Sequence, residues 1–341
     1  MLPDWPRVLG TPLVNGVLKA QPEDFVVEEV FPVEFSDDGE FDWLWIEKRG
    51  DNTEYVAKQL ARLAGVQPKA VTYSGQKDRY AVTRQWFCVH LPGKNFPAWE
   101  VPESETWKIL RKGRHRQKLR LGSHRYNHFT LCLSDLAGDI DDLNRRLSTV
   151  LVQGFPNYFG EQRFGHHGGN IDACRQWFAG EIKPARFERS MYLSAARSLL
   201  FNELLAQRVL DGSWNTGLDG DVYALRDSGS VFSAERDDET IARLASGDIQ
   251  PTGPLFGKAG RLVVSGVAAE REAAVYTQHS NFCAGLLKHG LSLERRALRL
   301  IPQDFQWQFT GNKSLELSFS LPRGCFATAL VRELMNYPLA S

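Results

Sequence analysis

The first part of the chain alternates between apolar and polar positions over short stretches, a pattern typical of β-strands with one buried face. Between two of these stretches, apolar residues recur at i, i+4, i+7 and i+8 from Val56. This spacing predicts a helix that Asn52 caps and Gly65 ends, and a second amphipathic helix is predicted at 139–153. The predicted strands lie at 25–31, 41–46, 71–74, 83–91, 118–121 and 127–133.

From about residue 154 the apolar spacing changes to the helical period, and after Pro302 the alternation returns. Glycine-rich stretches at 216–230 and 252–266 predict loops. The sequence therefore predicts an α+β fold, in which a sheet domain formed by 1–152 and 303–341 is interrupted by an inserted, largely helical domain at 153–302. Helices are predicted at 171–178, 190–210, 237–245, 267–278, 281–289 and 325–334, and strands at 305–309 and 315–321.

The composition is that of an ordinary globular chain of 341 residues, with 43% hydrophobic and 24% charged residues. Neither a secretory signal nor an apolar run of the ~18 residues that a membrane helix needs is evident. The five cysteines are scattered without a C-x-x-C pair, which suits a reducing compartment. We expect a cytoplasmic protein without membrane association that acts as a monomer.

Metal and cofactor sites are not indicated by any motif. The adjacent pair His166-His167 has no third ligand at a suitable spacing, and neighbouring side chains in an extended loop point apart. The glycine-rich stretches match neither the P-loop nor the dinucleotide-binding pattern. We therefore expect neither a metal nor a cofactor.

The net charge is zero, with 41 basic and 41 acidic residues, but the charges are unevenly distributed. Residues 106–134 contain no Asp or Glu and eight Lys or Arg residues. A solvated protein face, the alternative, usually mixes both signs, whereas a cluster of one sign is typical of phosphate contact. We interpret this stretch as a local RNA or DNA surface. The candidate contacts are Arg114, Arg116 and Lys118.

The loop Gly75-Gln76-Lys77-Asp78 joins two predicted strands and carries a single carboxylate. Loops between the strands of a rigid scaffold often present catalytic groups. Lys77 and Arg79 flank Asp78 and favour its ionised form, which can act as a nucleophile or a base. The alternative is that Asp78 is an ordinary turn residue.

Two other segments carry residues that suit a bound nucleotide. Lys19 could pair with the Asp78 carboxylate, and Phe25 could stack on a base. Asn127 could bind a base edge through its amide, and Phe129 could stack. The alternatives are a turn asparagine and aromatic residues of the core.

The segment 154–170 is rich in glycine, aromatic residues and asparagine, which suits a wall that contacts RNA. Its Arg163 and the loop residue Lys77 are further candidates for RNA contact.

As a set, these motifs resemble the TruD family of transfer-RNA pseudouridine synthases. Individually the motifs are short, but six of them in the same order make the resemblance specific, and they span nearly the whole chain. In chain order they are Lys19-x-x-Pro-Glu-Asp-Phe25, Gly75-Gln-Lys-Asp78, Asn127-x-Phe129, the segment 156–165, Ser194-Ala-Ala-Arg197 and Phe326-Ala-Thr.

The resemblance implies a pseudouridine synthase-type catalytic domain with a mixed or antiparallel sheet, interrupted by an inserted TRUD domain. It implies an isomerase, an intramolecular transferase that converts the uridine at position 13 of transfer RNA to pseudouridine without a cofactor. Asp78 aligns with the nucleophile of the family and Lys19 with a lysine beside it. The residues that align with binders of the substrate nucleotide are Phe25, Asn127 and Phe326.

One position departs from the family pattern. Tyr126 precedes Asn127 where relatives often have glycine, and a positive φ would strain a tyrosine there.

The residues alone leave two other functions open. One is a non-catalytic RNA-binding or remodelling protein that uses the same basic stretch. The other is an Asp-dependent nucleoside or glycoside hydrolase, although the second carboxylate of a glycosidase is not evident beside Asp78. The order of the bond steps is open too: attack at C1′, attack at C6, or removal of the C2′ proton.

Overall fold

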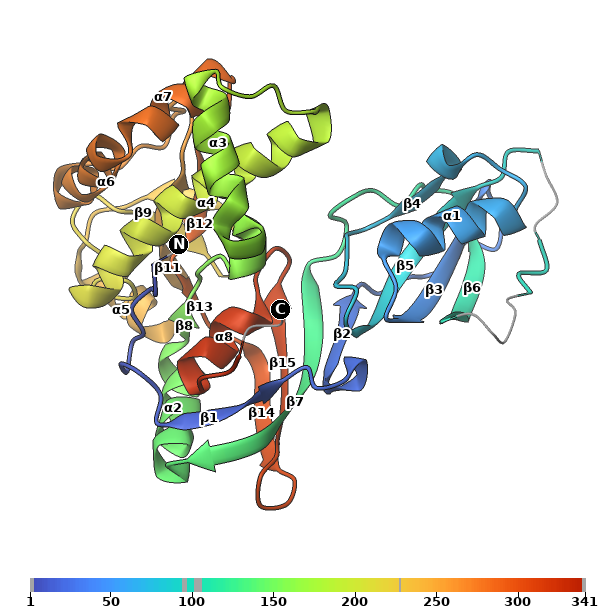
Figure 1. The fold of residues 1–341 in the computed structure, drawn as a ribbon, viewed down its shortest axis with the longest axis horizontal. Helices are drawn as coiled ribbons and strands as arrows, with labels where there is room; N and C mark the ends of the chain where they lie inside the picture. Colours follow the sequence, from blue (N-terminus) through green and yellow to red (C-terminus); the bar gives the residue numbers. More distant parts are fainter. Residues whose placement is uncertain (1–2, 94–96, 101–105, 227, 339–341) are drawn as a thin grey trace. The chain divides into compact units, whose positions relative to one another are not determined.

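The computed structural model describes residues 3–93, 97–100, 106–226 and 228–338, and the chain packs into two compact units (Figure 1). The sheet unit comprises Val14–Ile140, Pro302–Gly324 and Asn336–Ser341. The helical unit comprises Met1–Leu13, Asp141–Ile301 and Cys325–Met335. This division describes packing, and the functional domains at 1–152, 153–302 and 303–341 stay a prediction.

The sheet unit is built on one mixed sheet, whose described strands follow the order β14-β15-β7-β2-β5-β3-β6, with β1 paired to β7 and β4 to β5. Strands β2 and β5 pair in parallel, and the other pairings among the described strands of this sheet are antiparallel. The bounds are β1 (Val14–Leu18), β2 (Phe25–Val30), β3 (Phe41–Arg49), β4 (Val71–Tyr73), β5 (Val82–His90), β6 (Trp107–His115), β7 (Tyr126–Gly138), β14 (Gln303–Phe309) and β15 (Leu315–Pro322).

Helix α1 (Thr53–Leu63) covers part of one face of this sheet. Its i, i+4 spacing places Val56 and Leu60 on one side, where both are fully buried together with Leu44 of β3 and Phe87 of β5. The predicted helix between Asn52 and Gly65 is thereby confirmed. Short 3-10 helices precede β2 at Pro22–Asp24 and β4 at Pro68–Ala70.

The basic part of the chain folds differently from the prediction. A strand forms at β6, which was not predicted, whereas 118–121, predicted as a strand, forms none in the described structure. Strand β6 lies at the end of the sheet order, where exposed charged side chains are tolerated and mask the apolar alternation. The signal at 118–121 came from Leu119, which is buried in a cluster with Trp43 and Trp86.

The helical unit contains the helices predicted for the middle of the chain and for 325–334. Its described α-helices are α2 (Ile140–Gln153, which enters this unit at Asp141), α3 (Gly169–Ala179), α4 (Arg186–Leu210), α5 (Asp238–Ser246), α6 (Gly266–Gln278), α7 (Ser280–Lys288) and α8 (Ala327–Leu334). The long helix α4 supplies most of the core, burying Leu200, Phe201 and Leu204. Short 3-10 helices lie at Glu161–Phe164 and His166–Gly168. Within the described residues, no helix is long and apolar enough to span a membrane.

The glycine-rich stretches of this unit were predicted to be loops, but parts of them form strands. They contribute to a sheet of order β10-β9-β11-β12, beside a short pair formed by β8 and β13. Prolines and Gly253 inside β11 hid the strand, but a Cβ at Gly253 would meet Phe201 of α4 at 3.1 Å, so glycine allows close packing there. The bounds are β8 (Phe155–Pro156), β9 (Val222–Leu225), β10 (Val231–Ser233), β11 (Ile249–Leu255), β12 (Glu294–Ala297) and β13 (Arg299–Leu300).

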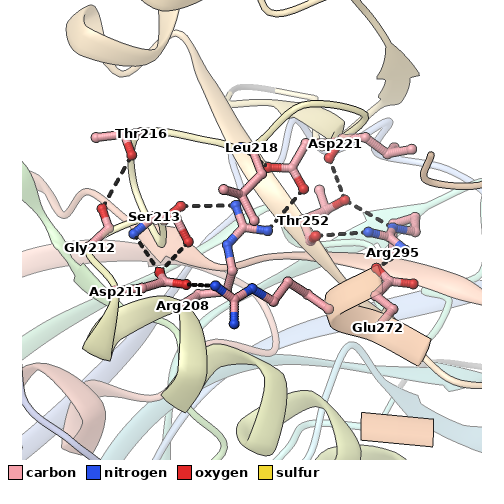
Figure 2. Close-up of polar contacts among 12 residues, drawn as sticks. Arg208, Asp211, Gly212, Ser213, Thr216, Leu218, Asp221, Thr252, Glu272 and Arg295 are labelled. Atoms are coloured by element: carbon pink, nitrogen blue, oxygen red, sulfur yellow. Dashed lines mark hydrogen bonds and ion pairs between the residues drawn. The ribbon is translucent and has the colours of Figure 1, made fainter. Parts of the chain in front are cut away.

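Buried ion pairs tie these elements together (Figure 2). Arg208 of α4 donates to both carboxylate oxygens of Asp221, at 3.0 and 2.6 Å. Arg295 of β12 pairs with Glu272 of α6 at 2.7 Å and donates to the carbonyl and hydroxyl of Thr252 in β11. Since each guanidinium has several partners, the cost of burying its charge is offset.

Candidate active site

On one face of the large sheet, which is mostly apolar, four neighbouring strands each bury a polar side chain close to the same loop. The strand registers place these four side chains on the same face. Buried polar side chains need hydrogen-bond partners, so this set marks a place where another segment must bind. We call it the polar row, and its members are Asn127 of β7, Glu29 of β2, Gln85 of β5 and Lys48 of β3.

The segment that the polar row binds is the loop of residues 74–81, which follows β4 and is called here the Asp78 loop. Strand β4 pairs antiparallel with β5, which confirms the predicted strands on both sides of the loop. Gln85 Nε2 donates to the carbonyl of Gly75 at 2.8 Å, and Lys48 Nζ donates to the carbonyl of Asp78 at 2.8 Å. Glu29 and Asn127 bind the Lys77 ammonium at 3.0 and 2.6 Å.

Two further side chains complete the support of the loop. The hydroxyl of Thr53, the first residue of α1, donates to Gln85 Oε1 at 3.0 Å and accepts from the Lys77 backbone N–H at 3.1 Å. The hydroxyl of Ser74 donates to the Glu29 carboxylate, which also accepts from the Trp86 backbone N–H at 3.2 Å. The loop backbone is therefore fixed at several points by side chains that are themselves fixed.

Burial governs the ionisation of the cations beneath the loop. It lowers the pKa of Lys48 to about 8, against the attraction of the nearby carboxylates of Asp78 and Asp51. Burial also lowers the pKa of Lys77, which the Glu29 carboxylate opposes. The same cause lowers the pKa of His124, whose Nδ1 lies 3.7 Å from Glu29 Oε1. The oxygen atoms that the Lys48 and Lys77 ammonium groups face oppose this loss of positive charge, whereas the lowered pKa of His124 favours its neutral imidazole.

The Asp78 carboxylate lies on the open side of its loop, with 41% of the side chain exposed. Lys19 Nζ contacts Asp78 Oδ2 at 2.8 Å, so the ion pair considered from the sequence is confirmed. The same ammonium lies 3.8 Å from the centre of the Phe25 ring. Lys19 has a left-handed backbone with φ of 65°, a conformation that costs energy in a residue other than glycine and is common at functional sites.

The structure places other predicted residues of the sheet unit in the core. Phe129 is buried, stacked on Phe319 at 5.4 Å with Phe25 edge-on at 6.2 Å, as in the alternative interpretation of a core aromatic. The Lys77 side chain is 7% exposed, and its ammonium group contacts Glu29 and Asn127. We therefore correct the assignment of Lys77 as an RNA contact, because its ammonium serves the protein interior.

The basic candidates line the edge of the sheet. Arg114, Arg116 and Lys118 are exposed. Arg114 lies in β6, and Arg116 and Lys118 follow the end of this strand at His115. Arg116 makes two bonds of 2.7 Å with Asp38, a partner from outside the basic stretch. Such exposed pairs contribute little to stability, so Arg116 can exchange Asp38 for a phosphate at low cost. RNA contact at this edge stays a prediction.

The helical unit gathers three of the predicted motifs into one cluster of its own. Phe326 is half-buried at the start of α8 and packs against Phe159 with ring centres 6.0 Å apart. The Arg163 guanidinium lies 5.7 Å from the Phe326 ring centre and donates to the Ser194 hydroxyl at 3.0 Å. Nearby in sequence, the rings of His166 and His167 stack at 4.1 Å, so the expectation that these side chains point apart is wrong.

Comparison with known proteins identifies the family. The family model of tRNA pseudouridine synthase D (TruD) matches residues 7–173 and 184–334. Proteins named tRNA pseudouridine synthase D from Pseudomonas putida (strain W619) and Pseudomonas syringae pv. syringae (strain B728a) are each 48% identical over 332 residues, covering 97% of this chain and 94% of the relative. This chain belongs to the tRNA pseudouridine synthase D family.

A crystal structure assigned to TruD from Methanosarcina mazei has the same fold, with a TM-score of 0.70 and 21% identity, over 95% of this chain and 94% of that one. Membership of the TruD family confirms the recognition made from the motifs. It implies isomerisation of uridine to pseudouridine with transfer RNA as the substrate.

The position that departs from the TruD pattern is unstrained. Tyr126 begins β7 and has the extended backbone of a strand, and its hydroxyl accepts from Gln303 Nε2 at 3.1 Å. The predicted cost of a positive φ therefore does not arise, and Asn127 keeps its place in the polar row.

Sequence reasoning missed the residues that support the Asp78 loop, although a signal for two of them existed. Lys48 continues the apolar alternation of Leu44 and Ile46, and Glu29 continues that of Phe25 and Val27. A charged residue in phase with buried positions of a strand indicates a buried polar contact. Gln85 and Thr53 gave no comparable signal.

Proposed function

We propose that this protein isomerises the uridine at position 13 of transfer RNA to pseudouridine, with Asp78 as the nucleophile. The observation that supports this is a solvent-open carboxylate on a loop whose backbone is fixed from beneath. Among the described residues, Asp78 Oδ2 binds Lys19 and Oδ1 has no hydrogen-bond or ion-pair partner. One oxygen is thus held in place while the other is free to approach the substrate.

The reaction suits this inventory of groups. The bond between N1 of uracil and C1′ of the ribose breaks, a bond between C5 and C1′ forms, and C5 loses a proton while N1 gains one. Oxidation state and atom count are unchanged, so a positioned carboxylate and proton transfers account for the chemistry. Asp78 attacks C1′, attacks C6 or removes the C2′ proton. In each case the Lys19 ammonium holds the Asp78 carboxylate in place and stabilises its negative charge.

In this proposal Asn127 of the sheet unit contacts the substrate nucleotide, the buried Phe25 ring lies beside Lys19 in the same unit, and Phe326 of the helical unit is a separate RNA contact. Asn127 supplies an amide at the end of an otherwise apolar strand face, and Phe326 offers a half-buried ring in the helical unit. A target uridine must leave its stack, which costs a few kcal/mol. Stacking on aromatic rings, at about 1–3 kcal/mol per base, and phosphate contacts offset this cost.

The direct test is to incubate the purified protein with transfer RNA that lacks modifications and to map pseudouridine. The proposal expects pseudouridine at position 13, and the same position should lack it in cells without the protein. Binding of the RNA without any isomerisation would instead support the RNA-binding alternative. Release of free uracil would support the hydrolase.

Replacing Arg114, Arg116 and Lys118 with alanine is expected to weaken transfer-RNA binding and to flatten its salt dependence. The slope of log K against log salt should fall by about 0.7–0.9 for each phosphate that the protein no longer neutralises. A matched control removes the exposed Lys58, Arg62 and Lys69, on or just after α1. Equal slopes for the two triple variants, measured by a binding titration at several salt concentrations, would contradict an RNA surface at β6.

A further inference from the structure

The geometry points to a selectivity device beneath the Asp78 loop: Lys77, held by Glu29, orients the Asn127 amide so that its NH₂ group faces the C4 carbonyl of uracil and rejects cytosine. This inference rests on the proposed function and names the group that selects its substrate. It assigns Lys77 and Glu29 as positioning residues, and Asn127 as the residue that contacts the base.

The orientation of the amide follows from the partner of its oxygen. Lys77 Nζ lies 2.6 Å from Asn127 Oδ1 and 3.0 Å from Glu29 Oε1. A lysine ammonium has donors and no acceptor, so the amide atom that it contacts must be the oxygen. The Asn127 NH₂ group therefore occupies the opposite end of the amide.

Reversal of the amide is costly because every member of the set is fixed. Glu29 faces Asn127 directly across the β2–β7 ladder, so their side chains project from the same side of the sheet. The Glu29 side chain is fully buried and also accepts from Ser74 and from the Trp86 N–H. Turning the amide would set two donors, the NH₂ and the ammonium, against each other where both side chains are only 7% exposed.

The NH₂ group is the end of Asn127 left for a ligand. Within the described residues, Asn127 Nδ2 has no hydrogen-bond partner, although the residue is 7% exposed overall. Lys77 also precedes Asp78 in the chain, so the segment that fixes the amide is the one that carries the carboxylate. A donor is thus presented beside the reacting group.

Uracil offers this donor two carbonyl acceptors, at C2 and at C4, and only the one at C4 separates uracil from cytosine. Uracil and cytosine are identical at N1, C5, C6 and O2, so the isomerisation itself does not distinguish them. They differ at C4, where uracil has a carbonyl acceptor and cytosine an amino donor, and at N3. A fixed NH₂ group donates to the C4 carbonyl and opposes the C4 amino group, which selects uracil.

A substrate series tests the assignment with the protein unaltered. Transfer RNAs with uridine, 4-thiouridine or 2-thiouridine at the target position are compared by single-turnover rate and by binding. Sulfur is a weak acceptor, so 4-thiouridine should lower the rate or affinity about tenfold, while 2-thiouridine should stay within about threefold of uridine. A larger effect of the 2-thio substitution would overturn the assignment to C4.

Protein variants test the amide and its support. In the Asp78→Asn background, which prevents turnover, affinities are measured for transfer RNAs that differ only by uridine or cytidine at the target. Asn127 should favour uridine by about 10–100-fold. Asn127→Asp keeps the shape and the Lys77 contact but turns an acceptor toward the base, so the preference should vanish or reverse. An undiminished preference would overturn the role of the amide.

The positioning role is separated by the charge-neutral double variant Lys77→Met with Glu29→Gln, which leaves no unpaired buried charge. In this variant the Asn127 amide can turn, so affinities for the uridine and cytidine transfer RNAs should differ by no more than about threefold. Asn127→Ala gives the reference value of this ratio when the amide is absent. A preference equal to that of Asn127 with Lys77 and Glu29 intact would overturn the inference. If the unaltered protein forms no pseudouridine, the proposed function fails instead, whatever the variants show.

Discussion

Replacing Asp78 with asparagine is expected to lower the rate of pseudouridine formation by at least about 10³-fold, while affinity for transfer RNA stays within about threefold. Asparagine keeps the size of the side chain and the backbone carbonyl that Lys48 binds, but it lacks the negative oxygen that the reaction needs. The measurement is a single-turnover assay at saturating enzyme, with affinity from a separate binding titration.

A suitable control for this variant is Asp135→Asn, an exposed aspartate of β7. Asp135 has a φ of 53°, which asparagine adopts readily, so this control changes one charge without straining the strand. Full isomerisation by the Asp78 variant would remove the nucleophile from the proposal. Loss of binding together with rate would indicate that Asp78 shapes the site and does not act on the substrate.

Replacing Lys48 with methionine is expected to reduce kcat by about 10–100-fold with a smaller change in KM. The Lys48 ammonium donates to the carbonyls of Asp51 and Asp78, both at 2.8 Å, and it is fully buried. Without it, two carbonyls lose a partner, at about 1–3 kcal/mol each, and the loop can shift the carboxylate by a fraction of an ångström. The loss falls on the chemical step because substrate contacts elsewhere are kept.

Steady-state kinetics and hydrogen exchange of residues 74–81 test this expectation together. Exchange in the loop should rise in Lys48→Met and stay unchanged in Lys58→Met, which removes an exposed lysine of α1. A variant with faster loop exchange but unaltered kcat would show that the position of the Asp78 backbone does not limit the reaction.

The sequence predicted the elements whose signal is local. Apolar residues at helical spacing located α1 and α4, and the lone carboxylate between two β-rich stretches located the Asp78 loop. The ion pair between Lys19 and Asp78, 59 positions apart, follows from their places in motifs of one family and from the suitability of a cation beside a carboxylate. These inferences need residue types and spacing alone.

Strand pairing decided the rest. Lys77, a candidate RNA contact from the sequence, is buried because Glu29 and Asn127 face each other across two strands and both contact its ammonium group through oxygen atoms. The polar row depends on the order β7-β2-β5-β3, and on a register that sets its four members on the same face. A shift by one residue would turn all of these side chains to the other face.

The chain by itself thus determined which residues can do chemistry: a carboxylate in a loop, a lysine to accompany it and a basic stretch at 106–134. Tertiary structure decided which of the charged groups are open to a substrate and which are used to hold the loop. The physical reason is that a charge is buried or exposed according to the partners that sheet register brings to it, and register joins residues whose spacing along the chain carries no signal.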